Sequence, residues 1–236
     1  MKGGVGKTTI AVNLAWASAT LSNRRTLLWD LDAQAASTFI LAPKRPGRDE
    51  ARAVLERDIA PEDIIIPTDI KGLDLIPADS SLRGLDIIFA EIGRKKRLLR
   101  LTDALAARYD RIILDCPPGL GVTSDQLIRG ASLILLPMIP STLSRRAYGE
   151  VRDHLDRHHK GGPTIFPVFT MVDRRRLAHR AAVAADPGCP AIPMASAVEQ
   201  MADRHAPIGA YAPKSPAAKA FASLWTAIER RIAGRP

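Results

Sequence analysis

Residues Lys2-Gly3-Gly4-Val5-Gly6-Lys7-Thr8-Thr9 decide how this chain folds, because they place three glycines and a lysine directly before a helix. Glycines let backbone N–H groups curl around an anion, and the positive end of the following helix stabilises that anion. Residues 10–21 then carry apolar side chains at helical spacing, namely Ile10, Leu14, Ala17 and Leu21. The stretch therefore predicts a phosphate-binding loop at a helix N-terminus.

A loop of this kind normally follows a β-strand, which aims its amides at the end of a sheet. Only Met1 precedes Lys2, and Met1 occupies the place of the first glycine in the strict Gly-x-x-x-x-Gly-Lys-Thr pattern. We therefore expect the first strand to be missing, which leaves a gap at a central position of the sheet. A chain that begins upstream of Met1 explains this better than a working protein that dispenses with the strand.

Short apolar runs predict the remaining strands, which we expect at residues 26–32, 73–77, 111–115, 133–137 and 165–172. Such continuous runs suit strands that are buried on both faces of a parallel sheet. Helical patterns alternate with them, with helices expected at 50–58, 81–108 and 217–232. The alternation predicts an α/β fold, a doubly wound and mostly parallel sheet flanked by helices, in a single domain over residues 1–236.

The composition is that of an ordinary globular protein with an excess of positive charge. The chain has 236 residues, of which 46% are apolar, and 34 Lys and Arg against 25 Asp and Glu give a net charge of +9. Neither Cys116 nor Cys189 has a metal-ligand spacing, which favours a reduced, cytoplasmic chain. No apolar run reaches the length of a membrane span. The charge indicates an anionic partner, nucleic acid before membrane.

The loop, residues 2–9, resembles the deviant Walker A motif of the ParA/MinD family of ATPases. Asp30-Leu-Asp-Ala-Gln is similar to the Asp-Leu-Asp-Pro-Gln of the family's switch I region, although Ala33 and Ala35 replace its usual Pro and Gly. Asp115-Cys-Pro-Pro-Gly resembles its Walker B acid and switch II. The resemblance spans nearly the whole chain and implies a P-loop ATPase of the ParA/Soj partition type.

The resemblance also implies roles for individual residues. The loop residues that would bind ATP are Gly3, Gly4, Val5, Gly6, Lys7, Thr8 and Thr9. Lys7 is expected on the β- and γ-phosphates, whereas Thr8 directly and Asp115 through water would hold Mg²⁺. Asp32 would orient the attacking water. Lys2 is the signature lysine, which implies a homodimer that closes over two ATP molecules, so the expected catalytic residues are Lys2, Lys7 and Asp32.

The C-terminal half supplies expected contacts to adenine and DNA. Residues 169–176 and 191–194 resemble the family's Asp-Arg and Ile-Pro-Arg segments, which makes Asp173, Pro193 and Met194 candidate adenine contacts. Clustered arginines follow two strands and would contact nonspecific DNA through its phosphates, namely Arg145, Arg146, Arg174, Arg175, Arg176 and Arg180. The resemblance further implies a ParB-like centromere-binding partner and association with the nucleoid.

Two other functions fit parts of the sequence less well. A MinD-like membrane-cycling ATPase would use a basic amphipathic helix, and residues 217–232 carry an apolar stripe beside Arg230 and Arg231. Because such a stripe is more often a helix docked on its own sheet, we expect no membrane binding. A small-molecule kinase or ligase would need an acceptor site, for which no signature is visible.

Two further expectations concern single features of the sequence. Cys116 is expected to be a small buried side chain rather than a nucleophile. Residues 94–97 are expected to form an exposed basic cluster on a helix.

Overall fold

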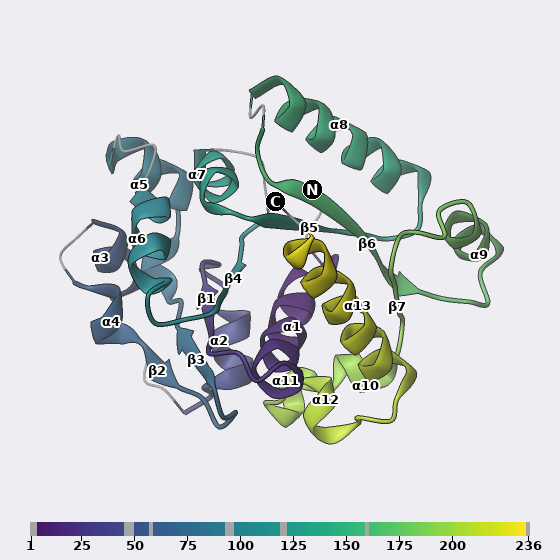
Figure 1. Cartoon of the computed structure of the whole chain (residues 1–236), viewed down its shortest axis with the longest axis horizontal. Coiled ribbons are helices and arrows are strands. Elements are labelled where there is room, and N and C mark those ends of the chain that lie inside the picture. Colours follow the sequence, from purple (N-terminus) through teal and green to yellow (C-terminus); the bar gives the residue numbers. More distant parts are fainter. Residues whose placement is uncertain are drawn as a thin grey trace.

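The computed structural model describes residues 4–44, 50–56, 59–92, 97–118, 122–158 and 161–234. Figure 1 shows strands in the middle of the molecule with helices on both faces. The elements of the first half are α1 (Lys7–Leu21), β1 (Thr26–Asp30), α2 (Ala36–Leu41), α3 (Ala51–Glu56), α4 (Pro61–Ile64), β2 (Ile66–Pro67), β3 (Leu73–Ile76), the 3₁₀ turn η1 (Ser80–Leu82), α5 (Leu85–Ile92), α6 (Arg97–Leu105) and β4 (Arg111–Asp115). Those of the second half are α7 (Val122–Gly130), β5 (Leu133–Met138), α8 (Thr142–His158), β6 (Thr164–Val172), α9 (Leu177–Ala184), β7 (Ala191–Pro193), α10 (Ser196–Glu199), α11 (Met201–Arg204), α12 (Ile208–Tyr211) and α13 (Pro216–Ala233).

The strands form two sheets, and the break between them lies at the expected gap. One sheet has the order β2-β3-β1-β4 and the other the order β5-β6-β7. All strand pairs are parallel except β2 with β3. The predicted α/β fold with a mostly parallel sheet flanked by helices is thus confirmed. The interruption falls between β4 and β5, which is a central position, as expected.

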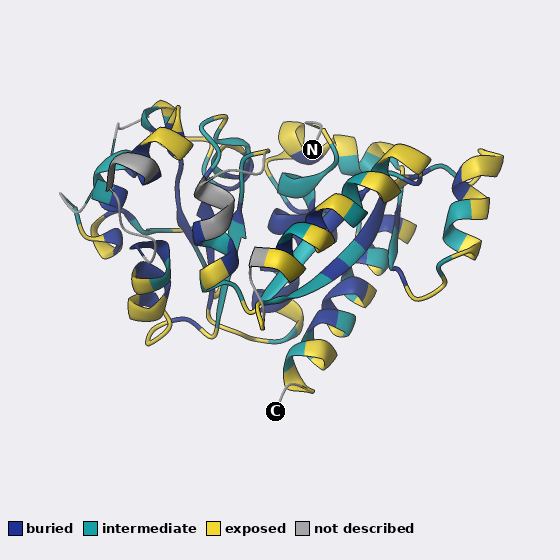
Figure 2. Ribbon diagram, turned by 90° about the horizontal axis from the view of Figure 1, so that it is seen from above, coloured by how far each residue is buried: buried dark blue, intermediate teal, exposed yellow. Residues whose placement is uncertain are grey.

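Burial follows the layered architecture. Every residue of β1 is buried, as expected for a strand covered by helices on both faces. Figure 2 shows buried strands between helices whose outer faces are exposed. Helix α1 is buried along most of its length, because it packs against β1, β4 and α13. The helix behind the loop is therefore held in place by both halves of the sheet layer.

Helix α13 belongs to the core. Ser215 caps it by accepting a hydrogen bond from the Ala218 N–H at 3.1 Å, and Pro216 occupies its first turn. Its apolar stripe, which includes Phe221 and Trp225, is buried against α1 and β7, and Figure 1 shows it lying beside α1. The preferred reading of residues 217–232 as a docked helix is confirmed. Within the described residues, no helix has the length and apolarity needed to cross a bilayer.

Two expectations about local structure were wrong. The long helix expected over residues 81–108 is three pieces, η1, α5 and α6, and residues 93–96 lie outside the described residues.

The second concerns Arg97, which was expected on an exposed basic face but is only 8% exposed. Its guanidinium donates to the carbonyls of Val54 at 2.6 Å and Leu55 at 2.9 Å. Burial of this arginine is tolerated because its polar head forms hydrogen bonds, two of them to those carbonyls.

We expect Gly209→Ala to destabilise the protein by about 1–3 kcal/mol, because a Cβ on this α12 residue would overlap the Trp16 ring of α1. Gly149→Ala is the matched control, since a Cβ there meets nothing within 4 Å in the interior of α8. That control should be neutral or stabilising by up to about 1 kcal/mol. Urea unfolding of both variants tests this, and equal midpoints would contradict the close contact.

Candidate functional site

The phosphate loop lies where the strands of both sheets have their carboxyl ends. Gly4 and Gly6 have φ of 80° and 86°, a left-handed backbone that glycine adopts readily, and α1 begins immediately after Gly6. The hydroxyl of Thr170, in β6, donates to the Val5 carbonyl at 3.0 Å and so fixes the loop against the second sheet. The first amides of α1 lack helical partners and remain available to an anion. Lys2 and Gly3 lie outside the described residues.

The expected metal ligands meet at the end of β4. The Thr8 hydroxyl hydrogen-bonds to Asp115, and the Ser37 hydroxyl donates to the same carboxylate at 2.6 Å. Asp115 is only 2% exposed, and burial raises its pKa, while these hydrogen bonds and the nearby Lys7 ammonium oppose the rise. Thr8 and Asp115 thus present the hydroxyl and carboxylate oxygens that Mg²⁺ prefers.

Asp30 ends β1 next to Asp115, because β1 and β4 are in register and pair Asp30 with Asp115, and Asp32 follows two residues after the strand. Asp30 accepts from the backbone N–H and the hydroxyl of Thr38 at 2.9 and 2.8 Å. Burial raises the pKa of Asp30 to about 7 despite those bonds. Asp32 is half-buried at the rim and accepts from the Gln34 N–H at 3.0 Å. Asp30 is therefore a structural anchor for α2, whereas the Asp32 carboxylate is close enough to Asp115 to contribute to the raised pKa of Asp115.

Ala35 lies in the turn that connects these acids to α2. Its φ of 50° and ψ of 37° are left-handed, a conformation that costs an alanine roughly 1 kcal/mol relative to glycine. The switch I pattern that the sequence resembles has glycine at this place, a residue that adopts a left-handed backbone readily. Cys116, which follows Asp115, is a poor nucleophile because burial raises its pKa to about 12.

The three candidate adenine contacts lie together where β6 and β7 end. The Met194 N–H donates to the Val172 carbonyl at 3.1 Å, which places Pro193 and Met194 beside Asp173. Both oxygens of Asp173 accept from the Arg175 guanidinium at 3.0 Å, and this ion pair lowers the pKa of Asp173 to about 2. The Asp173 carboxylate is thus committed to Arg175, while Met194 remains 57% exposed.

The two arginine clusters share one surface, as expected from their positions after strand ends. The Arg145 guanidinium, in the first turn of α8, donates to the Ala182 carbonyl of α9 at 3.0 Å. Arg146 pairs with Glu150 at 3.1 Å, and Arg175 pairs with Asp173. Within the part of the chain that the structure describes, no carboxylate forms an ion pair with Arg174, Arg176 or Arg180. All six side chains are exposed.

Comparison with known proteins places this chain in a family. The AAA_31 family, described as an AAA domain, matches residues 1–160. The chain belongs to this family. The chromosome partitioning protein ParA of Myxococcus xanthus is 38% identical over 141 residues, which cover 58% of this chain and 49% of that protein. The chain spans about half the length of the curated relatives it matches.

Solved structures resemble this chain over nearly its whole length. A cobyrinic acid a,c-diamide synthase from Mycobacterium smegmatis, with bound ATP analog and magnesium, has a TM-score of 0.79 at 28% identity and covers 98% of this chain and 91% of that one. The cell division ATPase MinD of Pyrococcus furiosus has a TM-score of 0.79 at 25% identity, covering 98% and 95%. The resemblance to the ParA/MinD-type domains is confirmed.

Four contacts at this candidate site were not predicted from the sequence. Ser37 and Thr38 hold Asp115 and Asp30, Thr170 fixes the loop, and Asn13 donates to the Thr9 carbonyl at 2.8 Å. Ser37 and Thr38 had a visible signal, since two hydroxyls begin the helix after an acidic strand end. Thr170 had none, because its partner Val5 lies 165 residues away.

Proposed function

We propose that this protein is a partition-type ATPase that binds ATP with Mg²⁺, associates with DNA in that state and releases it on hydrolysis. One observation carries the proposal. The loop glycines, Lys7, the Thr8–Asp115 pair and Asp32 come from three separate segments and converge at one end of the sheets. Phosphoryl transfer depends on this kind of positioning and charge stabilisation, with little covalent chemistry required of the protein.

The residues at the loop fit a nucleotide with its metal. Positive φ at Gly4 and Gly6 opens the backbone, and a Cβ at Gly4 would meet nothing within 4 Å, so the cradle is not filled by other groups. The Lys7 ammonium would hold the β- and γ-phosphates, and Thr8 and Asp115 would hold Mg²⁺, which neutralises phosphate charge when bound. The Asp32 carboxylate would position water. Lys2 would complete the partner's site in an ATP-bound homodimer.

The arginine surface of α8 and α9 supports DNA as the ligand. Its arginines are exposed at the starts of α8 and α9 and in the loop before α9, where they can reach phosphates without reading bases. Because Arg146 and Arg175 are paired with Glu150 and Asp173, the charges that remain for DNA are chiefly those of Arg145, Arg174, Arg176 and Arg180. A ParB-like centromere-binding protein would accelerate hydrolysis, and the protein would localise to the nucleoid in the cytoplasm.

We expect the double variant Arg174→Glu/Arg176→Glu to lose at least about tenfold in DNA affinity, with ATP affinity unchanged, because two phosphate contacts become repulsive. The slope of log affinity against log salt should fall by about 2. Co-sedimentation with DNA in ATP, in ADP and without nucleotide, at two salt concentrations, measures both effects. The control Arg100→Glu/Arg108→Glu makes the same charge change on exposed positions in and just after α6, a helix that Figure 1 shows far from α9, and should bind normally.

One observation favours a second candidate, a MinD-like ATPase that cycles on a membrane surface. Leu143 and Leu177 are 70% and 72% exposed, and they lie beside the arginines at the starts of α8 and α9. Basic and apolar side chains together suit an anionic lipid surface. If the unmodified protein hydrolyses ATP yet fails to sediment with DNA, ATP-dependent binding to anionic liposomes is the measurement that would favour this candidate.

A further inference from the structure

The side chain of Thr170 connects the second sheet to the phosphate loop. Its hydroxyl donates to the Val5 carbonyl at 3.0 Å, across 165 residues of sequence. Thr170 is only 4% exposed, so its hydroxyl has little access to solvent as an alternative partner. Because a buried hydroxyl without a partner is costly, the fold favours loop conformations that keep the Val5 carbonyl facing Thr170. Strand β6 therefore holds a carbonyl of the loop in a fixed direction.

A β-bulge in β6 follows directly after Thr170. Val168 packs in an apolar cluster with residues of α1, whereas Phe169 packs in a separate cluster, so these neighbours lie on opposite faces of the sheet. By this alternation Thr170 shares the α1 face with Val168. Between Phe169 and Val172, β6 then advances three residues while β7 advances two, and Met171 takes a left-handed φ of 53°. Bulges of this kind re-aim side chains beside functional sites.

The direction of the Val5 carbonyl fixes the direction of the next amide. The chain has no cis peptide bond among its described residues, and in a planar trans peptide the C=O and the N–H point in opposite directions. With the Val5 oxygen held against β6, the Gly6 N–H points away from β6. Within the described part of the chain, no group accepts a hydrogen bond from this N–H. The loop therefore offers it as a donor beside the first amides of α1.

We propose that Thr170 is a positioning residue for ATP binding, whose hydroxyl holds the Val5–Gly6 peptide in the orientation that presents the Gly6 N–H to a phosphate. Because this orientation is set before the nucleotide arrives, binding costs less conformational entropy of the loop. Thr170 acts through the peptide that it holds, so we expect it to affect nucleotide affinity more than turnover. The inference rests on the nucleotide-binding role of the loop in the proposed function.

The test compares two substitutions of Thr170. Thr170→Val keeps the branched shape but removes the hydroxyl, and it should weaken binding of both ADP and ATP by about tenfold, as expected for a misplaced hydrogen bond to a charged group. Turnover at saturating ATP should stay within about threefold, because a contact made equally in the ground and transition states changes KM alone. Thr170→Ser keeps the hydroxyl and should bind both nucleotides within about threefold of the unmodified protein.

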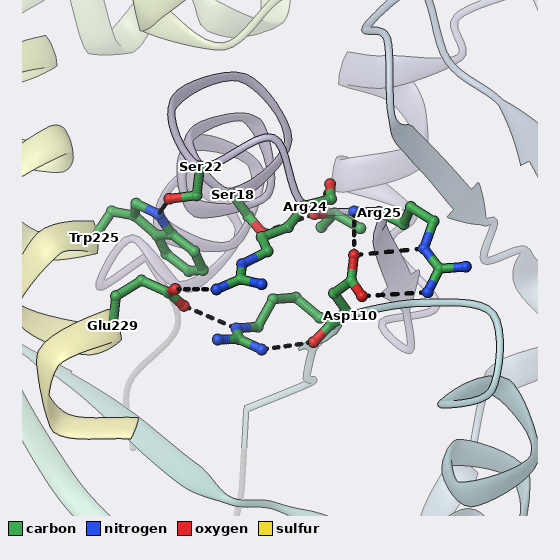
Figure 3. A network of polar contacts seen from close by, with 9 residues as sticks. Ser18, Ser22, Arg24, Arg25, Asp110, Trp225 and Glu229 are labelled. Atoms are coloured by element: carbon green, nitrogen blue, oxygen red, sulfur yellow. Dashed lines mark hydrogen bonds and ion pairs between the residues drawn. The ribbon is translucent and has the colours of Figure 1, made fainter. Parts of the chain in front are cut away.

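Thr26→Val is the matched control. Thr26, in β1, is a fully buried threonine whose hydroxyl bonds to that of Ser18 at 2.7 Å. Ser18 belongs to the polar network near the carboxyl end of α1, away from the loop (Figure 3). This control should lower Tm by about 3 °C but leave nucleotide affinity within about twofold. The proposal would be overturned by an equal loss of affinity in Thr26→Val, by unchanged affinity in Thr170→Val, or by a loss in Thr170→Ser as large as that in Thr170→Val.

Amide exchange of the unmodified protein gives an independent measurement that needs no variant. The Gly6 N–H should exchange at least about tenfold more slowly when ADP is bound, because it then donates to a phosphate. Equally slow exchange without nucleotide would show that this amide already has a partner, and would overturn the proposal. Weakened ATP binding in Lys7→Ala with normal binding in Thr170→Val would refute the role of Thr170 alone, whereas normal binding in both would refute the phosphate loop on which it rests.

Discussion

Lys7→Ala is expected to weaken ATP binding by at least about 100-fold, the largest effect of any single substitution that the site suggests. Lys7 is the first residue of α1, directly after the left-handed Gly6, and its ammonium is close enough to act on the pKa of both Asp115 and Cys116. The variant would leave the loop amides in place but remove the positive charge that faces the phosphates. A charge-assisted contact of this kind accounts for a loss of this size.

Titration with a fluorescent ATP analogue, with Mg²⁺ present, measures this loss. Lys219→Ala is the matched control, because Lys219 is an exposed lysine in α13, away from the loop, and its replacement should leave affinity within about twofold. Thermal unfolding of both variants checks that the fold is intact. Affinity of Lys7→Ala within about threefold of the unmodified protein would refute the phosphate-loop assignment.

Asp32→Asn is expected to lower ATP turnover by about 100-fold while ATP affinity changes by less than about threefold. The amide oxygen of asparagine can still accept the Gln34 N–H, which bonds to Asp32 at 3.0 Å, so the turn before α2 should survive. What the substitution removes is the negative charge at the site opening. A residue that acts on the transition state changes turnover without changing ground-state binding.

Phosphate release under saturating ATP measures turnover, and equilibrium titration measures affinity on the same preparation. Asp63→Asn provides the control, since this exposed carboxylate in α4 lies outside the site and should leave both quantities unchanged. Unaltered turnover in Asp32→Asn would assign the water-positioning role elsewhere. A parallel loss of affinity would instead indicate that Asp32 supports the loop or the metal.

Most of the fold was predictable because it depends on local patterns. The predicted strand at residues 111–115 coincides with β4, and those at 133–137 and 165–172 differ from β5 and β6 by one residue at one end. The strand at 26–32 was too long, because its acidic end leaves the sheet after Asp30. The helix at 81–108 failed because an apolar pattern over that length does not reveal a break into η1, α5 and α6.

The sequence alone determined the phosphate loop, the helix behind it, and the acids at the ends of β1 and β4. All of these follow from residue order, since backbone freedom, side-chain periodicity and the carboxyl ends of parallel strands are local properties. Only the tertiary structure decided which charges and hydroxyls pair. Ser37 reaches Asp115 across 78 residues, Arg97 reaches Val54 across 43, and the exposed Arg175 turns back onto Asp173. Such contacts depend on how the elements pack, because their partners are brought together only in the folded protein.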